Sequence, residues 1–470
     1  MQSTLQFYGG TGTVTGSNFL LETESPSTSF DKTQDKPLGS TRIRILVDCG
    51  LIQGKHTAEL DNWAAFPYEP ASVQYLVVTH AHIDHIGRIP KLVKEGFRGK
   101  IISTEATKSL VEPLLLDSME LLAHDARKHG RLPLYDTGDI ANAMGLWESV
   151  AYHRKVALPG DFVLEFYDAG HILGSAMAVF TREGKSIAFT GDLGGGNSPL
   201  LPPVEDIPHV DYLVMESVYG DRVRSADQNR RDTLENVIED TAARKGALLI
   251  PAFSTERTQD LLFEIRTLMV EKRIPSMPVY ADSPLAQKIT ASYLAHPEYF
   301  APAIRVRLEA GENIFAFPEL RFVESAEESR GIQSTKGPMI IIAGSGMSNG
   351  GRVHSHEKNI LPDKHSTLLI VGYQAAGSLG RRLAEGDKNV RIMGQQTPVR
   401  CRVEAIYGYS AHMDSQELLE FVNKTMGKLK EVFVVMGEPA SSSFLAQRIR
   451  DYLGTKATVP EIGSTVTLNV

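Results

Sequence analysis

The amino-acid sequence predicts an α/β protein with several sheets and more than one domain. Short apolar runs rich in β-branched and aromatic residues dominate the first part of the chain and end at Gly, Asp or Ser, as strands do. After Gly220 such runs alternate with helix-like stretches, which is the pattern of a parallel sheet with crossover helices. A length of 470 residues is enough for two or three domains.

The first part of the chain is expected to hold mostly strands. One long helix is predicted from about Ala106 to Arg127. Residues 22–41 are polar and rich in Pro, Ser and Thr, so we expect a long surface loop there between two strands. The expected strands are LQFYG, NFLLE, RIRILVD, YLVVT, KIIST, FVLEFYDAG, AMAVF, SIAFTGD and YLVMES.

The second part is expected to alternate strands and helices. Helices are predicted at Asn229–Lys245 and Arg257–Lys272, and further helices begin near Pro284 and after Gly350. The expected strands are ALLIP, PVYAD, MIIIAG, TLLIVG, RVEAI and VFVVM, and the last two helices are Asp414–Lys424 and Ser441–Tyr452.

Charge and cysteine content exclude several classes of protein. Two cysteines cannot make a disulfide framework, and no apolar stretch approaches the length that spans a membrane. The first residues lack the basic and apolar pattern of a signal peptide. The formal net charge of −8 argues against a protein that coats nucleic acid, but not against a charged cleft that holds a short piece of it. We therefore expect a cytoplasmic protein with no membrane partner.

Three histidines and an aspartate crowd into THAHIDHIGRIP, residues 79–90. His80, His82, Asp84 and His85 follow directly after YLVVT, which we interpret as a buried strand. Neutral imidazole and carboxylate are the usual ligands of zinc. A solvated loop that happens to contain histidines is the plainer alternative, but four candidate ligands in six positions favour a metal site.

Four ligands so close together do not suit one tetrahedral ion, and they suggest two pairs for two ions. Further candidates lie where other expected strands end. His171 occurs in YDAGHILGS, Asp192 in AFTGDLG and Asp48 in ILVDCG. Alone, an aspartate before glycine is often only a turn residue. Together these residues predict a site built at the ends of several strands.

These motifs, in this order, resemble the signatures of the metallo-β-lactamase fold. The second half resembles the β-CASP branch, whose members are nucleases that process RNA or DNA, and the likeness is closest to the RNA-cleaving bacterial and archaeal relatives of the endonuclease subunit of the pre-mRNA 3′-end cleavage factor. The motifs that carry it are MESVYGDR (215–222), IPAFSTERTQ (250–259), VYADSP (279–284), AGSGMSNGGR (343–352), VGYQAAGSLGRRL (371–383) and YSAHMD (409–414).

The resemblance implies a particular architecture. A four-layer αββα metallo-β-lactamase domain is expected from residues 1–220 and 400–470, with a β-CASP domain at residues 221–399 inserted between its two parts. The active site is expected in a cleft between the two domains. The resemblance also allows a homodimer.

The resemblance assigns a role to each candidate ligand. His80, His82 and His171 are expected to hold the first of two zinc ions, and Asp84 and His85 the second. Asp192 would bridge the two ions, and Asp48 would orient a ligand through a hydrogen bond. Glu216 and His412 are expected to pair, with the histidine as the acid that protonates the leaving oxygen. The expected catalytic residues are therefore Asp84, Glu216 and His412.

The sequence departs from the family pattern at one ligand position. In VFVVMGEP (432–439) the place of a zinc-binding histidine is taken by Met436, whose thioether is a poor zinc ligand. RNA-cleaving members carry histidine here, and DNA-processing members often carry an apolar residue. We expect a weaker second metal site. Three readings stay open: an active enzyme with a looser site, a shift towards DNA, or loss of catalysis with retained nucleic-acid or partner binding.

Substrate contacts are expected mainly in the second part of the chain. AGSGMSNGGR lies between an expected strand and an expected helix, where backbone N–H groups can approach a phosphate. A tight turn is the plain alternative for this loop, and a surface salt bridge for each arginine. The candidates are Tyr219, Arg257, Ser283, Ser345, Gly346, Met347, Arg352 and Arg381.

The function that the sequence predicts is a zinc-dependent ribonuclease. It would hydrolyse phosphodiester bonds in single-stranded RNA, with endonucleolytic cleavage expected, using two metal ions and a hydroxide nucleophile. The first alternative is a weakened or inactive homologue that binds nucleic acid or a partner protein, because of Met436. The second alternative is a DNA nuclease. A thioester or lactam hydrolase on the same fold is disfavoured by the whole second domain.

Overall fold

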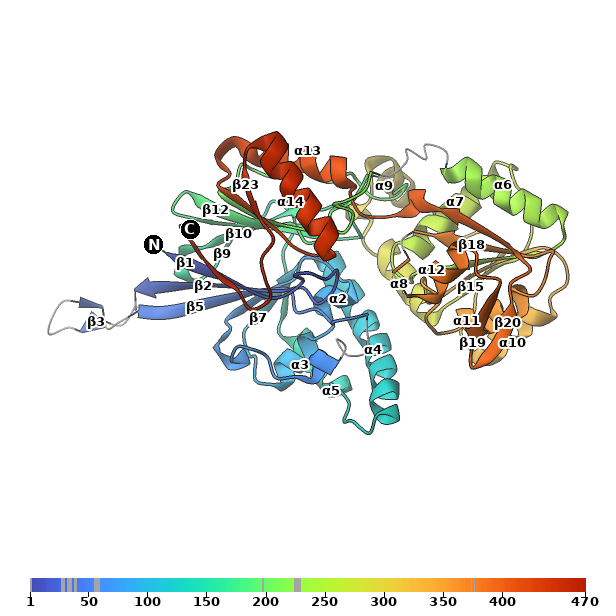
Figure 1. The fold of residues 1–470 in the computed structure, drawn as a ribbon, viewed down its shortest axis with the longest axis horizontal. Helices are drawn as coiled ribbons and strands as arrows, with labels where there is room; N and C mark the ends of the chain where they lie inside the picture. The colour runs from blue at the N-terminus through green and yellow to red at the C-terminus, as the bar shows by residue number, and fades with distance from the viewer. Residues whose placement is uncertain are drawn as a thin grey trace. The chain divides into compact units, whose positions relative to one another are not determined.

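The computed structural model describes residues 2–26, 30–31, 36–37, 40–54, 60–196, 198–223, 230–372, 374–375 and 377–470. The chain forms two compact units, whose elements Figure 1 labels. The first unit comprises Met1–Gly195, Pro203–Val223 and His412–Val470. The second comprises Gly196–Pro202 and Arg224–Ala411.

Two seven-stranded sheets form the middle of the first unit. The first sheet has the order β24-β1-β2-β5-β6-β7-β8, with antiparallel pairs from β24 to β5 and parallel pairs from β5 to β8. Its strands are β1 (Ser3–Gly9), β2 (Asn18–Pro26), β5 (Ser40–Val47), β6 (Tyr75–Val77), β7 (Lys100–Ser103), β8 (Trp147–Ser149) and β24 (Thr465–Leu468).

The second sheet has the order β23-β22-β13-β12-β11-β10-β9. The pairs among β9, β10, β11 and β12 are antiparallel, and those from β12 to β23 are parallel. Its strands are β9 (Val156–Ala157), β10 (Val163–Asp168), β11 (Ala176–Arg182), β12 (Lys185–Phe189), β13 (Tyr212–Met215), β22 (Glu431–Val434) and β23 (Lys456–Thr458).

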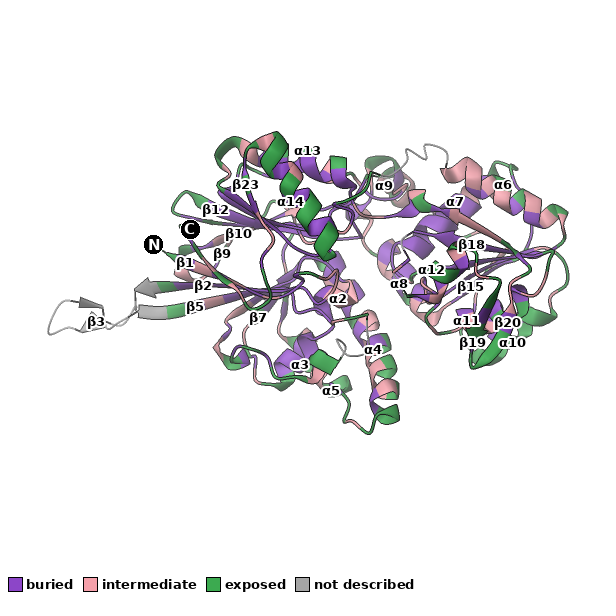
Figure 2. Cartoon of the chain, in the orientation of Figure 1, coloured by how far each residue is buried: buried purple, intermediate pink, exposed green. Residues whose placement is uncertain are grey.

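The two sheets pack face to face over one apolar core. Phe7 and Phe19 of the first sheet join Phe180 and Phe433 of the second in a single buried cluster. Alternating side chains of β1 enter this core, as expected for a strand with one face covered. Figure 2 shows the buried residues of the strands in purple.

Helices cover both outer faces, so the first unit has the predicted four-layer αββα architecture. A second buried cluster joins the outer face of β13 and β22 to the apolar sides of α13 and α14. On the other side, the helices between β6 and β8 lie against the first sheet. These helices are α2 (Ile83–Ile86), α3 (Ile89–Lys94), α4 (Glu105–Lys128) and α5 (Thr137–Gly145), and the opposite layer is α13 (Ser415–Thr425) and α14 (Pro439–Leu453).

The prediction of a loop at residues 22–41 is wrong at both ends of that range, where the structure has strands. Strand β2 continues to Pro26 and β5 begins at Ser40, with paired residues from Glu22↔Arg44 to Pro26↔Ser40. The polar residues have partners across the strands: Arg44 Nε donates to Glu22 Oε2 at 2.6 Å. Between them, β3 (Phe30–Asp31) pairs with β4 (Lys36–Pro37), and residues 27–29, 32–35 and 38–39 lie outside the described residues.

The second unit is built on one all-parallel sheet with the order β16-β15-β17-β14-β18-β21. Strands β14, β17 and β18 are buried along their whole length, as expected for a sheet with helices on both faces. The strands are β14 (Ala247–Pro251), β15 (Val279–Asp282), β16 (Leu320–Phe322), β17 (Met339–Ala343), β18 (Thr367–Val371) and β21 (Arg402–Ile406).

Seven α-helices and a hairpin accompany this sheet in the described part of the second unit. The helices are α6 (Arg230–Ala243), α7 (Arg257–Val270), α8 (Pro284–Leu294), α9 (Pro302–Glu309), α10 (Ala326–Gly331), α11 (Val353–Ile360) and α12 (Leu379–Ala384), and the hairpin pairs β19 (Asn389–Ile392) with β20 (Gln395–Pro398). No helix among the described residues is long and apolar enough to cross a membrane.

The boundary between the units differs from the expected one at residue 400. Strand β21 was expected in the metallo-β-lactamase domain, but it pairs in parallel with β18 at the edge of the second unit's sheet. The second unit therefore extends to Ala411, and it also includes Gly196–Pro202.

Candidate metal centre

The histidine cluster lies in the first unit, where β6 ends and the short helix α2 begins. His80 is buried in the connecting segment, His82 is the residue just before the helix, and the single turn of α2 carries Asp84 and His85. His171 follows β10, and Asp192 follows β12. The loops of His171 and Asp192 are joined by a hydrogen bond from Gly194 N to Ala169 O of 2.8 Å.

Three imidazoles and a carboxylate converge on one point. His82 Nδ1 lies 3.1 Å from His80 Nε2 and 3.2 Å from His171 Nε2. Asp192 Oδ2 lies 3.5 Å from His80 Nε2 and 3.6 Å from His171 Nε2. Ligand atoms around a tetrahedral zinc, bound at about 2.0–2.1 Å, are about 3.3 Å apart. The separations in this group fit a shared ion.

The electrostatic environment keeps two of these imidazoles, those of His82 and His171, in the form that binds metal. Burial and the neighbouring His80 lower the pKa of His82 well below its ordinary value. Burial and the neighbouring His412 do the same to the pKa of His171. Both rings are therefore neutral at physiological pH, and neutral imidazole is the ligating species.

A second group adjoins the first and shares Asp192. His85 Nδ1 is 2.7 Å from Asp48 Oδ2, which leaves Nε2 directed towards Asp192 Oδ1 at 3.4 Å and Asp84 Oδ2 at 3.9 Å. Asp48 is itself held by the backbone N–H of Thr79 at 2.9 Å and the hydroxyl of Ser17 at 3.1 Å.

Buried polar atoms of both groups have no hydrogen-bond partner. Among the described residues these include His85 Nε2, Asp192 Oδ1 and His171 Nδ1. Burial alone would lower the pKa of His85, but Asp192 and Asp48 raise it well above its ordinary value, because their negative charge favours a positive charge at this ring. A cation near His85 Nε2 and the Asp84 and Asp192 carboxylates would be stabilised by the same charges and would satisfy the unpartnered atoms, so the residues present fit a metal ion.

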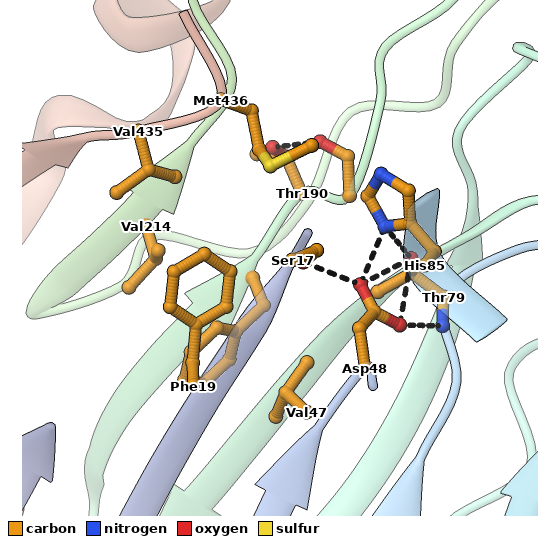
Figure 3. A pocket seen from close by; sticks show the side chains of 12 residues that line it. Ser17, Phe19, Val47, Asp48, Thr79, His85, Thr190, Val214, Val435 and Met436 are labelled. Carbon is orange, nitrogen blue, oxygen red and sulfur yellow. Dashed lines mark hydrogen bonds and ion pairs between the residues drawn. The ribbon is translucent and has the colours of Figure 1, made fainter. Parts of the chain in front are cut away.

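Met436 lies beside this second group and does not resemble a ligand. It is buried in the apolar core after β22, has a φ of +47°, and donates its backbone N–H to Gly10 O at 2.6 Å. Figure 3 shows that Met436 lines the same small cavity as His85, Asp48 and Thr190. A Cβ atom on Gly10 would lie 2.6 Å from Met436 Sδ, so the thioether packs against bare backbone.

Glu216 and His412 form the expected pair next to the cluster. Glu216 Oε1 lies 3.0 Å from His412 Nδ1, and both carboxylate oxygens also accept backbone N–H groups, from Leu193 at 2.7 Å and Val218 at 3.2 Å. Burial alone would lower the pKa of His412, but Glu216 raises it to about 9. The imidazole is therefore charged at neutral pH, and its Nδ1 is the atom that faces Glu216.

The Glu216 pair also approaches Asp192. One ligand atom each of Asp192, Glu216 and His412 lie within 4.8 Å of one another, a spacing that a metal ion accepts. Each oxygen of Glu216 in this group also accepts one backbone N–H group. The ring of His412 lies against that of His171 with centroids 4.7 Å apart, and the Tyr219 ring stands perpendicular to it at 6.0 Å.

The remaining substrate candidates lie in the second unit, and three arginines there have partners. Arg257 is buried, with ion pairs to Glu256 at 3.0 Å and Asp260 at 3.8 Å. Arg352 Nη1 donates to Asp282 Oδ1 at 2.6 Å, and Arg381 Nε donates to Glu385 Oε1 at 2.6 Å. Ser283 caps α8 by accepting the backbone N–H of Ala286, and Ser345, Gly346 and Met347 form the loop between β17 and α11.

Two residues that hold the metal centre were not expected from the sequence. Thr79 Oγ1 reaches Asp48 Oδ2 at 2.9 Å and His80 Nδ1 at 3.1 Å, and Ser17 supports the same carboxylate. Thr79 directly precedes His80, and this position in the sequence could have indicated that Thr79 supports the site. Ser17 is distant in sequence from every candidate ligand, and it reaches Asp48 through the pairing of β2 with β5 and through backbone hydrogen bonds to Gly50 and Asp84.

Three family profiles match the sequence and together span most of it. They are the metallo-beta-lactamase superfamily at residues 40–234, the Beta-Casp domain at 258–383 and the Zn-dependent metallo-hydrolase RNA specificity domain at 396–460. The chain belongs to the β-CASP branch of the metallo-β-lactamase superfamily, which consists of metal-dependent hydrolases, so the predicted resemblance is confirmed.

Individual relatives are similar over nearly the whole chain. Ribonuclease TTHA0252 of Thermus thermophilus is 36% identical over 81% of this chain and 85% of that protein. The RNase J-like protein of Methanocaldococcus jannaschii is 32% identical over 90% of this chain and 93% of that protein. Transcription termination factor FttA of Methanosarcina mazei is 31% identical over 88% of this chain and 66% of that protein.

A solved structure supports the fold independently. A protein of unknown function from Enterococcus faecalis V583 aligns with a TM-score of 0.53 over all of both chains, at 13% sequence identity. At that identity the likeness concerns the fold alone.

Proposed function

We propose that the protein is a zinc-dependent ribonuclease that hydrolyses phosphodiester bonds within single-stranded RNA. The observation that carries this proposal is the adjacency of two arrangements: a buried imidazole–carboxylate cluster with unpartnered atoms, and a charged histidine held by a buried glutamate. Ribonuclease TTHA0252 and the RNase J-like protein, both similar to this chain over most of its length, support RNA as the substrate.

The residues present would hold two ions. His80, His82, His171 and Asp192 form the first set, and Asp84, His85 and Asp192 form the second. Zinc bound there supplies a hydroxide nucleophile at neutral pH and neutralises charge on the phosphate. Asp48, itself fixed by Thr79 and Ser17, sets the orientation of His85.

His412 would protonate the leaving oxygen. Glu216 binds Nδ1 and stabilises the charged ring, so the proton on Nε2 is available for transfer. A positioned acid of this kind contributes typically about 10²–10⁴-fold to the rate. The buried backbone hydrogen bonds to Glu216 keep the pair in place while the proton moves.

The second metal set has three protein ligands, because Met436 offers only a thioether at the fourth position. We infer that the second ion is bound more weakly than the first. An inactive homologue that binds nucleic acid or a partner protein is the competing function, and the same Met436 is the observation that favours it.

Two measurements test the proposal: zinc per chain on protein purified without chelator, and cleavage of a circular single-stranded RNA. A circle has no ends, so its cleavage demonstrates an endonuclease. We expect at least one zinc per chain and opening of the circle, with both lost in His171→Ala. If this chain and Met436→His both bind zinc but cleave neither circular nor linear RNA, the protein is instead the inactive homologue that binds nucleic acid or a partner protein.

A further inference from the structure

The chain passes between the two units four times, and the first and last passages adjoin residues of the proposed site. The passages lie at residues 195–196, 202–203, 223–224 and 411–412. Asp192 lies shortly before the first passage, and His412 directly follows the last. What holds the chain at these passages therefore bears on a proposed metal ligand and on the proposed acid.

Two buried acids of helix α7 hold the segments that enter the second unit. Asp260 and Glu264 are four residues apart, so they lie on one face of the helix. Asp260 Oδ1 accepts the hydroxyl of Ser198, in the segment Gly196–Pro202, at 3.0 Å. Glu264 Oε1 accepts Nη2 of Arg230 at 2.8 Å and Nε at 3.1 Å. Arg230 begins helix α6 shortly after the third passage, so one helix face binds both entering segments.

The same face of α7 holds the segment that leaves the second unit before His412. Tyr409 is fully buried, and its hydroxyl donates to Glu264 Oε2. Arg230 Nη1 donates to Gly408 O at 3.3 Å, and its guanidinium carbon lies 4.8 Å from the centroid of the Tyr409 ring. Arg230 and Glu264 therefore fix both the backbone and the side chain of this segment.

Stability alone does not account for this group of Arg230, Glu264 and Tyr409, which we call the anchor. A buried ion pair is often no more stabilising than apolar residues of the same size, because both charges lose their hydration. The anchor has a defined geometry instead, since the two oxygens of Glu264 accept three hydrogen bonds from Arg230 and Tyr409.

The residues after the anchor form a short segment that is fixed at both ends. Two residues separate Tyr409 from His412, and a chain of that length spans at most about 10 Å. On the other side of His412, the backbone N–H of Met413 donates to Leu193 O at 2.9 Å. Fixed ends restrict the orientation of the His412 ring, on which its 3.0 Å contact with Glu216 depends.

We propose that Arg230 and Glu264 are positioning residues for His412: they anchor Tyr409, and through the short segment that follows they keep the His412 ring against Glu216. The inference rests on the proposed ribonuclease function, in which His412 is the acid. The second unit would then contribute to proton transfer through the chain itself. Misplacing a reacting group by about 1 Å can reduce a rate by about 10²-fold, so the anchor should affect kcat.

The test follows the titration of His412 by NMR in zinc-loaded protein with isotope-labelled histidine, with the signal assigned by its loss in His412→Gln. We expect Arg230→Ala to lower the pKa of His412 towards its ordinary value, because the ring would lose contact with the Glu216 carboxylate. In cleavage of single-stranded RNA, kcat should fall by about 10- to 100-fold, and KM should not change.

Arg266→Ala is the matched control. Arg266 also lies in the second unit, on α7, and it also binds a glutamate and a backbone carbonyl: Glu312 at 2.6 Å and Ala316 O at 3.0 Å. Its side chain is 15% exposed, against 13% for Arg230. Arg266→Ala should leave the pKa of His412 and kcat unchanged, and equal effects of the two substitutions would overturn the inference.

A second arm separates positioning from a purely structural role. Arg230→Ala should move the alkaline limb of the kcat profile to lower pH, but it should cause no further movement when Glu216→Gln is already present, because both changes remove the same contact. Additive movements would overturn the inference, and so would an unchanged pKa of His412 in folded Arg230→Ala.

A milder substitution decides the question if calorimetry shows that Arg230→Ala does not fold. Tyr409→Phe keeps the buried ring and removes only the hydrogen bond to Glu264. It should change the pKa of His412 and kcat in the same direction by a smaller amount, and unchanged values would then overturn the inference. Tyr280→Phe, which removes a 3.2 Å hydrogen bond to Thr335 elsewhere in the second unit, is its control.

The two proposals fail in different ways, because the pKa of His412 is measured whether or not RNA is cleaved. If the parent cleaves RNA and the anchor substitutions change neither this pKa nor kcat, the positioning role is rejected and the ribonuclease stands. If the parent cleaves no RNA while Arg230→Ala lowers the pKa of His412, the ribonuclease is rejected and the anchor still holds the His412 ring.

Discussion

The chemistry of individual residues in the metal centre follows from charge and burial. His85 lies among three carboxylates with one ring nitrogen unpartnered, and His82 and His171 are held neutral. The candidate ligands could be picked out because four of them are clustered in six positions of the sequence. The ion pair of Arg352 could not, because Asp282 is distant in sequence and only the folded sheet brings the two side chains together.

We expect Met436→His to strengthen the second metal set. The backbone at this position has a φ of +47°, which histidine adopts more readily than methionine does. After dialysis, bound zinc should rise from about one to about two per chain. The variant should melt at a lower temperature than the parent in chelator and at a higher temperature in zinc.

Met393→His is the matched control for that experiment. Met393 also has a positive φ, of +48°, but it is 67% exposed on the β19–β20 hairpin. It should change neither zinc content nor the response of melting to zinc. If Met436→His bound no more zinc than the parent, the residue at position 436 would not be what limits zinc binding by the second metal set.

The Glu216–His412 pair predicts a pH dependence of catalysis. His412 acts as an acid, so the rate falls as pH rises through its pKa, which Glu216 raises. Glu216→Gln removes the negative charge and should move the alkaline limb of the kcat profile to lower pH, besides reducing kcat by about 10²-fold or more. Glu298→Gln, at the exposed His296–Glu298 pair, should leave the profile in place. A limb that does not move would exclude His412 as the acid.

Among the elements, the long periodic ones were predictable and the short polar ones were not. The helix expected from Ala106 to Arg127 is α4, whose start is fixed by Thr104 accepting the backbone N–H of Thr107. The predicted parallel strands β14, β17 and β18 are apolar throughout. The ends of β2 and β5 were missed because their side chains are polar, and the pairing that stabilises them joins residues far apart in the sequence.

Helix α11 contains a buried acid that predicts a pH-dependent stability. Burial raises the pKa of Glu357 to about 8, and neither of its oxygens has a hydrogen-bond partner among the described residues. A carboxyl with a raised folded-state pKa favours folding fully below its unfolded pKa, near 4.3, and this contribution is lost as pH rises through about 8.

Glu357→Gln keeps the shape and removes the titration. Relative to the parent, its free energy of unfolding should increase between pH 5 and pH 8, by roughly 1–4 kcal/mol. Urea unfolding at several pH values measures this difference. Glu327→Gln, at an exposed position of α10, should have the same free energy of unfolding as the parent at every pH. If the difference between Glu357→Gln and the parent did not change with pH, Glu357 would not have a raised pKa.

At the scale of the whole molecule, all the proposed metal ligands belong to one unit. An ion that binds only the folded state stabilises that unit, by about 2.7 kcal/mol when its free concentration is 100 times Kd. In calorimetry, zinc should therefore raise the unfolding temperature of the first unit. His171→Ala should abolish this response, and a response that survives would place the ions elsewhere.

The division into two units could be predicted only coarsely. The change from strand-rich sequence to alternating strands and helices, after Gly220, marks well the point where the chain passes from the first unit to the second. The point where the chain re-enters the first unit is harder to locate, because RVEAI has the composition of a buried strand in either unit. Its assignment depends on the pairing of β21 with β18.

The first unit is interrupted by the second, and this has a consequence for synthesis. All the histidine and aspartate ligands have left the ribosome long before His412 and strands β22, β23 and β24 are translated. A nascent chain therefore carries the cluster without His412, the proposed acid, and without the strands that close both sheets. Under the proposed function, the metal ligands and the proton donor can act together only after this last segment has been translated and the first unit has closed.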